Sequence, residues 1–156
     1  MIATIILAAG KGTRMDSNIP KVLHKLNGIS LIEHVINTSN KLNCSKIIAV
    51  IGHQKKVVRH SLENYKNLEF AEQNEQKGTA HAVKMCFKNL KEFSGDVLIL
   101  SGDVPLISLE TLKKLIDSKN KFGAKAAVLT ADIDNPHGYG RIIRDSKNRL
   151  NKITEH

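Results

Sequence analysis

The chain has 156 residues, of which 41% are apolar and 25% charged, and its formal net charge is +9. This length suits one domain with a real core, and we expect a single domain over residues 1–156. The basic residues are scattered without interleaved aromatic rings, and no apolar run could cross a bilayer, so we exclude nucleic-acid and membrane partners.

Short and nearly continuous apolar runs predict strands that are covered on both faces of a sheet. These runs are Ala3–Leu7, Lys46–Ile51, Leu68–Ala71, Asp96–Leu100 and Lys125–Thr130. Stretches of helical periodicity between them predict helices over Leu31–Leu42 behind a Ser30 cap, over Gly78–Leu90, and from Ser108 onward. The alternation predicts a Rossmann-like α/β fold, a mostly parallel sheet with helices on both faces. Ligands of such sheets bind beyond the carboxyl ends of the strands.

A glycine-rich turn follows the first strand. It reads Leu7-Ala8-Ala9-Gly10-Lys11-Gly12-Thr13-Arg14-Met15, and Pro20-Lys21 comes soon after. Small residues let the backbone approach a ligand, and its N–H groups can hold phosphates beside positive charge from Arg14 and Lys21. The residue order excludes a Walker loop, and the missing third glycine excludes a dinucleotide-binding turn. From this motif alone, a purely structural turn stays open.

The segment Leu7–Met15 with Pro20-Lys21 resembles the loop of nucleotidyltransferases that join nucleoside triphosphates to sugar phosphates. Pro20-Lys21-Val22-Leu23-His24 is similar to the version in N-acetylglucosamine-1-phosphate uridylyltransferases. The resemblance implies the nucleotide-diphospho-sugar transferase fold, Mg²⁺ as the cofactor, and UTP and N-acetylglucosamine-1-phosphate as substrates. It also implies that Arg14 and Lys21 are catalytic and contact phosphate oxygens. The residues that it assigns to substrate binding in this loop are Leu7, Ala8, Ala9 and Gly10.

A second stretch, Gln73–Ala82, resembles the uracil-recognition segment of the same family. Glutamine offers a donor and an acceptor to a base edge, Gly78 permits close approach, and Thr79 is placed to cap a helix. Taken alone, the stretch also fits a plain helix start. The resemblance assigns substrate binding to Gln73, Gln76, Gly78 and Thr79. Lys77 departs from the apolar residue usual in the family, which leaves another base open.

A carboxylate stands at the end of the fourth strand, in Ser101-Gly102-Asp103-Val104-Pro105-Leu106-Ile107. A carboxylate at the tip of a central strand suits Mg²⁺ held against a triphosphate, although isolated Gly-Asp turns are usually structural. The run resembles the metal-binding turn of the family, which implies Asp103 as the metal ligand and Ser101 and Gly102 as substrate contacts. Ser101 stands where the family often carries an aromatic residue.

The last motif is Gly138-Tyr139-Gly140-Arg141, which predicts a bend into a strand. The resemblance implies that Gly140 and Glu155 bind the sugar. In the family that the chain resembles, catalytic domains continue beyond the position of Glu155. The continuation supplies more sugar contacts and an asparagine of the metal site. Full-length relatives carry a β-helical acetyltransferase domain as well. We therefore interpret the chain as a C-terminally incomplete fragment or as a naturally shortened copy.

The implied reaction is attack by a sugar-1-phosphate oxygen on the α-phosphorus of UTP. It releases pyrophosphate and gives UDP-N-acetylglucosamine, which serves peptidoglycan synthesis. The nucleophile is already an anion, so alignment and charge neutralisation suffice. The alternatives are a nucleotide-binding remnant without turnover and a transferase for another base or sugar.

We expect a cytoplasmic protein, since no secretory signal opens the chain. An exposed edge strand of the sheet could pair with a second copy and make a homo-oligomer.

Cysteines and histidines predict no reactive or metal site. Cys44 and Cys86 lie in apolar patterns without partners at metal-ligand spacing, which predicts buried free thiols. The histidines show no zinc-ligand spacing on a helix face, so we expect surface or packed side chains. Those considered are His24, His34, His60 and His81.

Overall fold

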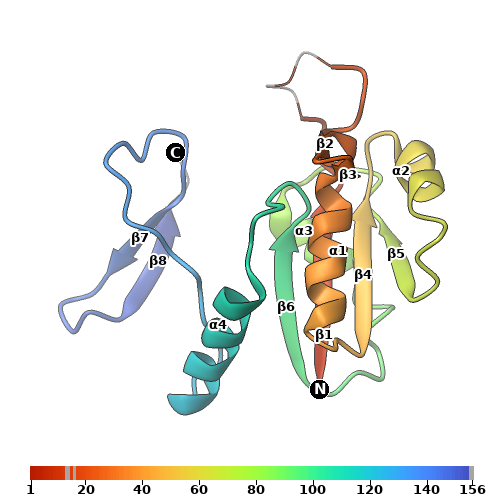
Figure 1. Cartoon of the computed structure of the whole chain (residues 1–156). Helices are drawn as coiled ribbons and strands as arrows, with labels where there is room; N and C mark the ends of the chain where they lie inside the picture. The colour runs from red at the N-terminus through yellow and green to blue at the C-terminus, as the bar shows by residue number, and fades with distance from the viewer. Residues whose placement is uncertain (13–14, 16, 155–156) are drawn as a thin grey trace. The chain divides into compact units, whose positions relative to one another are not determined.

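The computed structural model of the chain describes residues 1–12, 15 and 17–154. Its residues group into two units, Met1–Lys113 and Lys114–His156 (Figure 1). The elements of the first unit are β1 (Ile2–Ala8), the 3₁₀ helix η1 (Lys21–Leu23), β2 (Lys25–Leu26), β3 (Ile29–Ser30), α1 (Leu31–Lys41), β4 (Lys46–Ile51), α2 (Lys55–Ser61), β5 (Leu68–Glu72), α3 (Thr79–Met85) and β6 (Asp96–Ser101). Helix α4 (Leu109–Lys121) crosses the boundary, and β7 (Arg141–Arg144) and β8 (Leu150–Thr154) belong to the second unit.

The first unit is built on a parallel four-stranded sheet in the order β5-β4-β1-β6. Its strands match four of the predicted runs, with Ile5 of β1 opposite Ile48 of β4 and Ile99 of β6. Because all four strands run the same way, their carboxyl ends meet at one edge of the sheet (Figure 1). The glycine-rich turn and the Gly102-Asp103 turn both leave from that edge.

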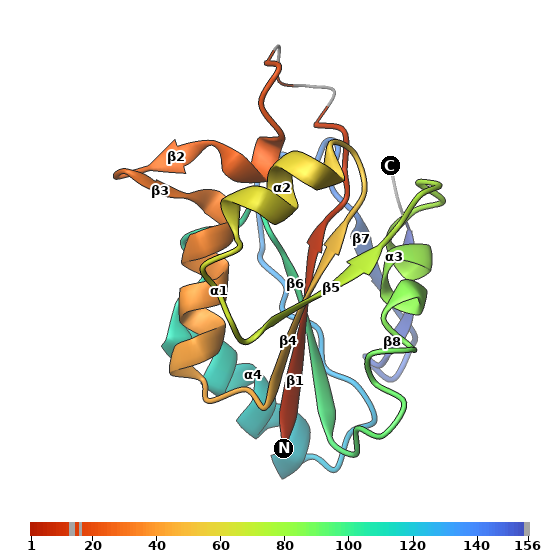
Figure 2. The same ribbon diagram turned by 90° about the vertical axis from the view of Figure 1, so that its right-hand side faces the viewer.

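Helices cover both faces of this sheet, as predicted (Figure 2). On one face, α1 and α2 bury Ile36 and Val58 against Ile6 and its neighbours. On the other face, α3 buries Ala82 against Ile5. Consecutive strand residues point to opposite faces, so Ile5 and Ile6 anchor two separate clusters of one sheet. The continuous apolar runs in the sequence follow from this double burial.

Helix α1 begins at the predicted cap. The main-chain N–H of Ser30 donates to Glu33 Oε2 at 3.0 Å, and the Ser30 hydroxyl donates to the same oxygen at 2.6 Å. Burial alone would raise the pKa of Glu33, but hydrogen bonds from Ser30 and Tyr65 outweigh it and hold that pKa below its usual range. The Glu33 carboxylate is therefore charged at neutral pH and completes a capping box.

We expect Ser30→Ala to lower the free energy of unfolding by about 1 kcal/mol, the usual cost of losing a cap. The measurement is urea unfolding at neutral pH. Ser94→Ala is the matched control, because Ser94 is exposed in the loop before β6. Equal midpoints for the two variants would contradict a stabilising role for the Ser30 hydroxyl.

Three sequence predictions need correction. Lys125–Thr130 is not a strand: in its own unit the only ladder joins β7 to β8 among described residues, and Val128 is 47% exposed. The helix predicted over Gly78–Leu90 ends at Met85, since Cys86 and Phe87 donate to residues three positions back and the chain tightens into turns. Thr79 does not cap α3. Gly78 occupies the cap with φ 88°, and no side chain bonds there.

Both cysteines are free thiols, as predicted. Cys86 is buried, and burial raises its pKa to about 11. Cys44 is only half-buried, with Sγ 3.1 Å from Thr4 Oγ1, and burial raises its pKa as well. Both thiols are therefore protonated at neutral pH and serve packing.

Among the described residues, none of the helices has the length and apolar character that a membrane span requires.

Candidate functional site

The candidate site is a pocket of about 240 Å³ at the carboxyl edge of the sheet. It is lined by Leu7, Ala8, Gly10, Gly12, Met15, Lys21, Val22 and Asp103. Five of these are residues that the sequence predicted for substrate or metal: Leu7, Ala8, Gly10, Lys21 and Asp103. They come from the end of β1, the start of η1 and the turn after β6. A second hollow, of about 380 Å³, lies by residues 64–68 and contains none of the predicted residues.

Opposite charges meet in this pocket. Lys21 Nζ lies 2.5 Å from Asp103 Oδ2, and the two side chains are 36% and 30% exposed. An ion pair this accessible contributes little to stability, so its partners can exchange for a ligand's charges. From the described part of its lining, the pocket therefore offers an ammonium group to an anion and a carboxylate to a cation.

Glycine backbones bring these two groups together. The Gly102 N–H donates to the Leu7 carbonyl at 2.9 Å, and a Cβ on Gly102 would lie 3.0 Å from that oxygen. Gly12 adopts φ +62°, and a Cβ there would lie 3.0 Å from Lys21 Cβ. The hydrogen bond holds the turn that carries Asp103 against β1, and the absence of a side chain on Gly12 leaves room for Lys21 beside the glycine-rich turn.

Gly52, a residue with no predicted role in the site, lies close to both Ala9 and Gln73. A Cβ on Gly52 would lie 2.8 Å from the Gln73 carbonyl oxygen, 2.9 Å from Ala9 Cβ and 3.0 Å from Ala9 O. The next residue, His53, donates its N–H to that same Ala9 oxygen at 3.2 Å. A glycine directly after a continuous apolar strand was the available signal for this close approach.

Gln73 is buried, with 4% of its surface exposed, and its amide nitrogen is used inside its own segment. Nε2 donates to the Gly78 carbonyl at 3.0 Å and lies 3.1 Å from His81 Nδ1. Its main-chain N–H donates to Ile51 O at 2.8 Å. Gln73 thus supports the turn at Gly78.

Gln76, by contrast, is exposed and donates from Nε2 to the Ala9 carbonyl at 3.0 Å. This bond bridges the segment after β5 to the glycine-rich turn. Lys77, which departs from the family pattern, forms an ion pair with Glu75. Gln76 is therefore the exposed glutamine of this segment, and its amide contacts the glycine-rich turn.

The remaining predicted residues are placed as follows. Ser101 is the last residue of β6 and is exposed, and Thr79 is the exposed first residue of α3. Gly140 directly precedes β7 in the second unit. Arg14 and Glu155 lie outside the described residues. In the described ranges no three His, Cys, Asp or Glu side chains gather as a metal cluster.

Comparisons with known proteins identify the family of this chain. The model of the MobA-like NTP transferase domain matches residues 4–153. The bifunctional protein GlmU of Rippkaea orientalis is 47% identical over 155 residues, which cover 99% of this chain and 34% of that protein. The bifunctional protein GlmU of Streptococcus agalactiae is 50% identical over 151 residues, 97% of this chain and 32% of that protein. The chain thus spans about a third of the length of these relatives.

Among solved structures, HddC from Yersinia pseudotuberculosis, complexed with GMP-PN, has a TM-score of 0.72 to this chain at 23% identity. The match covers 99% of this chain and 69% of that one, and it shows the fold. The parallel sheet with helices on both faces is therefore that of the nucleotidyltransferases, as predicted. Because the family model extends over nearly the whole sequence, the chain belongs to the family of MobA-like NTP transferase domains.

Proposed function

We propose that this chain binds UTP and serves uridylyl transfer to N-acetylglucosamine-1-phosphate, which gives UDP-N-acetylglucosamine and pyrophosphate. The observation that carries the proposal is the facing of Lys21 and Asp103 in a pocket walled by small residues. Relatives named bifunctional protein GlmU that are 47–50% identical to this chain support the choice of reaction. In the cell, the product would feed peptidoglycan synthesis in the cytoplasm.

The triphosphate would lie along the backbone that follows β1. A Cβ on Gly10 would have no atom within 4 Å, so the wall of the pocket is open there. Small residues at this point let main-chain N–H groups reach phosphate oxygens. Lys21 would contact these oxygens from the side, and we assign the same task to Arg14. The net charge of +9 favours the approach of such an anion.

A divalent cation, Mg²⁺ in this proposal, fits the Asp103 carboxylate. Mg²⁺ is commonly held by one or two carboxylates together with substrate phosphates, and Asp103 is the carboxylate among the described residues that line this pocket. When bound, the ion would neutralise triphosphate charge and make the α-phosphorus more electrophilic. Lys21, released from Asp103, is then free to stabilise the charge on the phosphate oxygens. The attacking phosphate oxygen is an anion, so no side chain has to remove a proton.

Base recognition is assigned to the segment Gln73–Thr79. The exposed Gln76 is assigned the contact with the base, and the buried Gln73 supports the turn at Gly78. We expect Gln76→Glu to weaken UTP binding by about tenfold, since it removes the amide donor and sets a carboxylate near the Ala9 carbonyl. Calorimetry measures the affinity. Glu92→Gln, the reverse exchange at an exposed residue outside this segment, is the control. Unchanged affinity in Gln76→Glu would remove Gln76 from the site.

The experiment that tests the function measures pyrophosphate release from UTP and N-acetylglucosamine-1-phosphate with Mg²⁺, together with UTP binding by calorimetry. Turnover supports the transferase. Binding without turnover supports a second candidate, a domain that holds the nucleotide without reacting. That candidate is favoured because Asp103 is the one carboxylate among the described residues that line the pocket. A folded sample that neither binds nor reacts overturns the proposal.

The same assay tests the choice of base and sugar. Lys77 and Ser101 depart from the family pattern, so the other nucleoside triphosphates and glucose-1-phosphate are also tested as substrates.

Pairing of two chains remains a proposal. Strands β5 and β6 form the two edges of the four-stranded sheet, and an edge strand can pair with a second copy of the chain.

A further inference from the structure

The turn that opens α2 contacts the glycine-rich loop. Gln54 adopts φ 49° and ψ 37°, the left-handed region that residues other than glycine seldom occupy. Its Nε2 donates to the Asn18 carbonyl at 3.1 Å, while the preceding His53 N–H donates to Ala9 O at 3.2 Å. Asn18 and Ala9 lie near the two ends of the first loop, by which we mean the described residues 9–12, 15 and 17–19. One turn therefore holds both ends of that loop.

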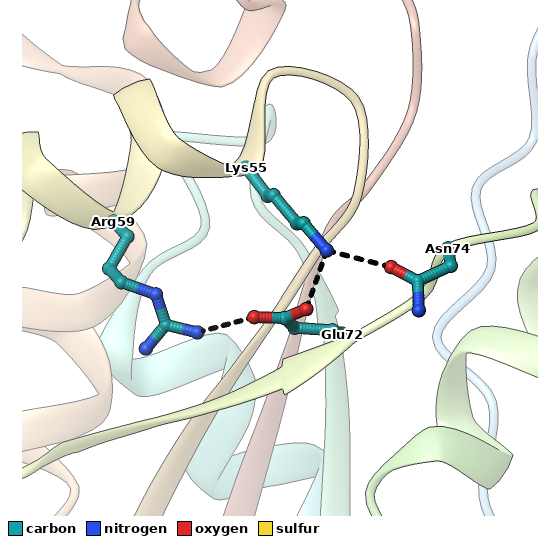
Figure 3. Close-up of polar contacts among 4 residues, drawn as sticks. All are labelled: Lys55, Arg59, Glu72 and Asn74. Carbon is teal, nitrogen blue, oxygen red and sulfur yellow. Dashed lines mark hydrogen bonds and ion pairs between the residues drawn. The ribbon is translucent and has the colours of Figure 1, made fainter.

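The next residue, Lys55, contacts a different loop (Figure 3). Its Nζ donates to Glu72 Oε2 at 2.6 Å and to Asn74 Oδ1 at 2.8 Å. Arg59, one turn along α2, donates to Glu72 Oε1 at 2.9 Å. Hydrogen bonds from Lys55 and then from Arg59 lower the pKa of Glu72, so its carboxylate stays charged. Lys55 thus ties α2 to Asn74 in the second loop, residues 73–78.

We propose that Gln54 and Lys55 are positioning residues, which set the spacing of the two loops between which the nucleotide binds. This inference rests on the proposed function. Two consecutive side chains of one turn contact two loops that are far apart in the sequence. The loops also meet directly through the Gln76 bond to Ala9 O. Exposed polar contacts add little to the free energy of folding. We therefore assign to the contacts of Gln54 and Lys55 the task of holding the two loops at a fixed distance.

The backbone of Gln54 makes the test sharp. Glycine adopts the left-handed conformation without strain, so Gln54→Gly relieves the backbone while it removes the contact with Asn18. A purely structural role predicts unchanged or higher stability and unchanged binding. A positioning role predicts unchanged or higher stability with weaker binding. Lys55→Met is the companion variant, since it keeps the side-chain stem and removes both polar contacts.

Two substitutions serve as matched controls. Asn43→Gly makes the same backbone change at another left-handed residue, φ 55°, which is exposed in the turn between α1 and β4. Lys56→Met removes the same charge at the exposed residue next to Lys55. Each protein is studied as the whole chain by thermal unfolding, by calorimetry with UTP and Mg²⁺, and by hydrogen exchange of the ligand-free form.

We expect Gln54→Gly and Lys55→Met each to bind UTP about five- to tenfold more weakly than the unaltered chain and both controls. Hydrogen exchange should quicken over residues 17–19 in Gln54→Gly and over residues 73–78 in Lys55→Met. If the unaltered chain binds UTP and both variants bind it equally well, the inference is overturned and the proposed function stands. If the unaltered chain does not bind UTP, the proposed function fails, and exchange that is unchanged in both variants overturns the inference separately.

Discussion

Replacing Asp103 by asparagine is expected to abolish the Mg²⁺ dependence of UTP binding and to reduce any turnover about a thousandfold. Asparagine has the size of aspartate, so the turn after β6 keeps its shape, and the Gly102 N–H still donates to Leu7 O. What is lost is the charge that faces Lys21. The fold should survive, since an ion pair exposed to this degree contributes little to stability.

The measurement is calorimetry of UTP at low and high Mg²⁺, with pyrophosphate release alongside, so that it does not depend on turnover. Asp117→Asn, the same exchange at an exposed residue of α4, is the control and should behave like the unaltered chain. An Asp103→Asn protein that keeps the full Mg²⁺ dependence would show that the cation binds elsewhere, and the assignment of Asp103 would fall.

The four strands of the parallel sheet could be predicted because each is a nearly continuous apolar run, the pattern of a strand that is buried on both faces. In β4, residues 47–51 are all apolar because both faces of the strand are covered. The run Lys125–Thr130 has a similar composition but lacks a ladder partner among the described residues of its own unit. A strand needs neighbouring N–H and carbonyl groups as well as propensity, and a run of residues does not reveal its neighbours.

Helix α2 was missed for a related reason. Only Val58 of its seven residues is buried, and the contacts that hold it reach Glu72 and Phe70 on β5. Valine is a modest helix former, so the local sequence gives a weak signal. The stabilising partners lie more than ten positions away in the chain.

Within the site, Lys21 and Asp103 could each be predicted to lie beyond the carboxyl ends of the strands, where parallel sheets bind ligands, but the ion pair between them came from the structure. Gln73 illustrates what the sequence does not contain. Its motif indicated a base contact, yet the direction of its amide depends on Gly78, whose φ of 88° brings the carbonyl oxygen within reach. That conformation exists only in the folded segment, so the support of the Gly78 turn by Gln73 had to come from the structure.

The second large effect is expected at Gly52, where alanine should destabilise the protein by about 3 kcal/mol and abolish detectable UTP binding. The added methyl group would lie 2.8 Å from the Gln73 carbonyl oxygen and 3.0 Å from Ala9 O, both main-chain atoms. Neither can move alone: Ala9 O accepts from His53 and Gln76, and the Gln73 N–H is bonded to Ile51. Relief of the clash therefore has to separate the two loops.

The matched control is Gly10→Ala, because a Cβ there meets no atom within 4 Å although Gly10 lines the same pocket. We expect Gly10→Ala to unfold at the urea concentration of the unaltered chain and to bind UTP more weakly, since its methyl group occupies space needed by phosphate. Gly52→Ala should lose stability and binding together. A Gly52→Ala protein of normal stability would mean that the loops separate without cost, and the close packing at Gly52 could then not be what fixes the distance across the nucleotide site.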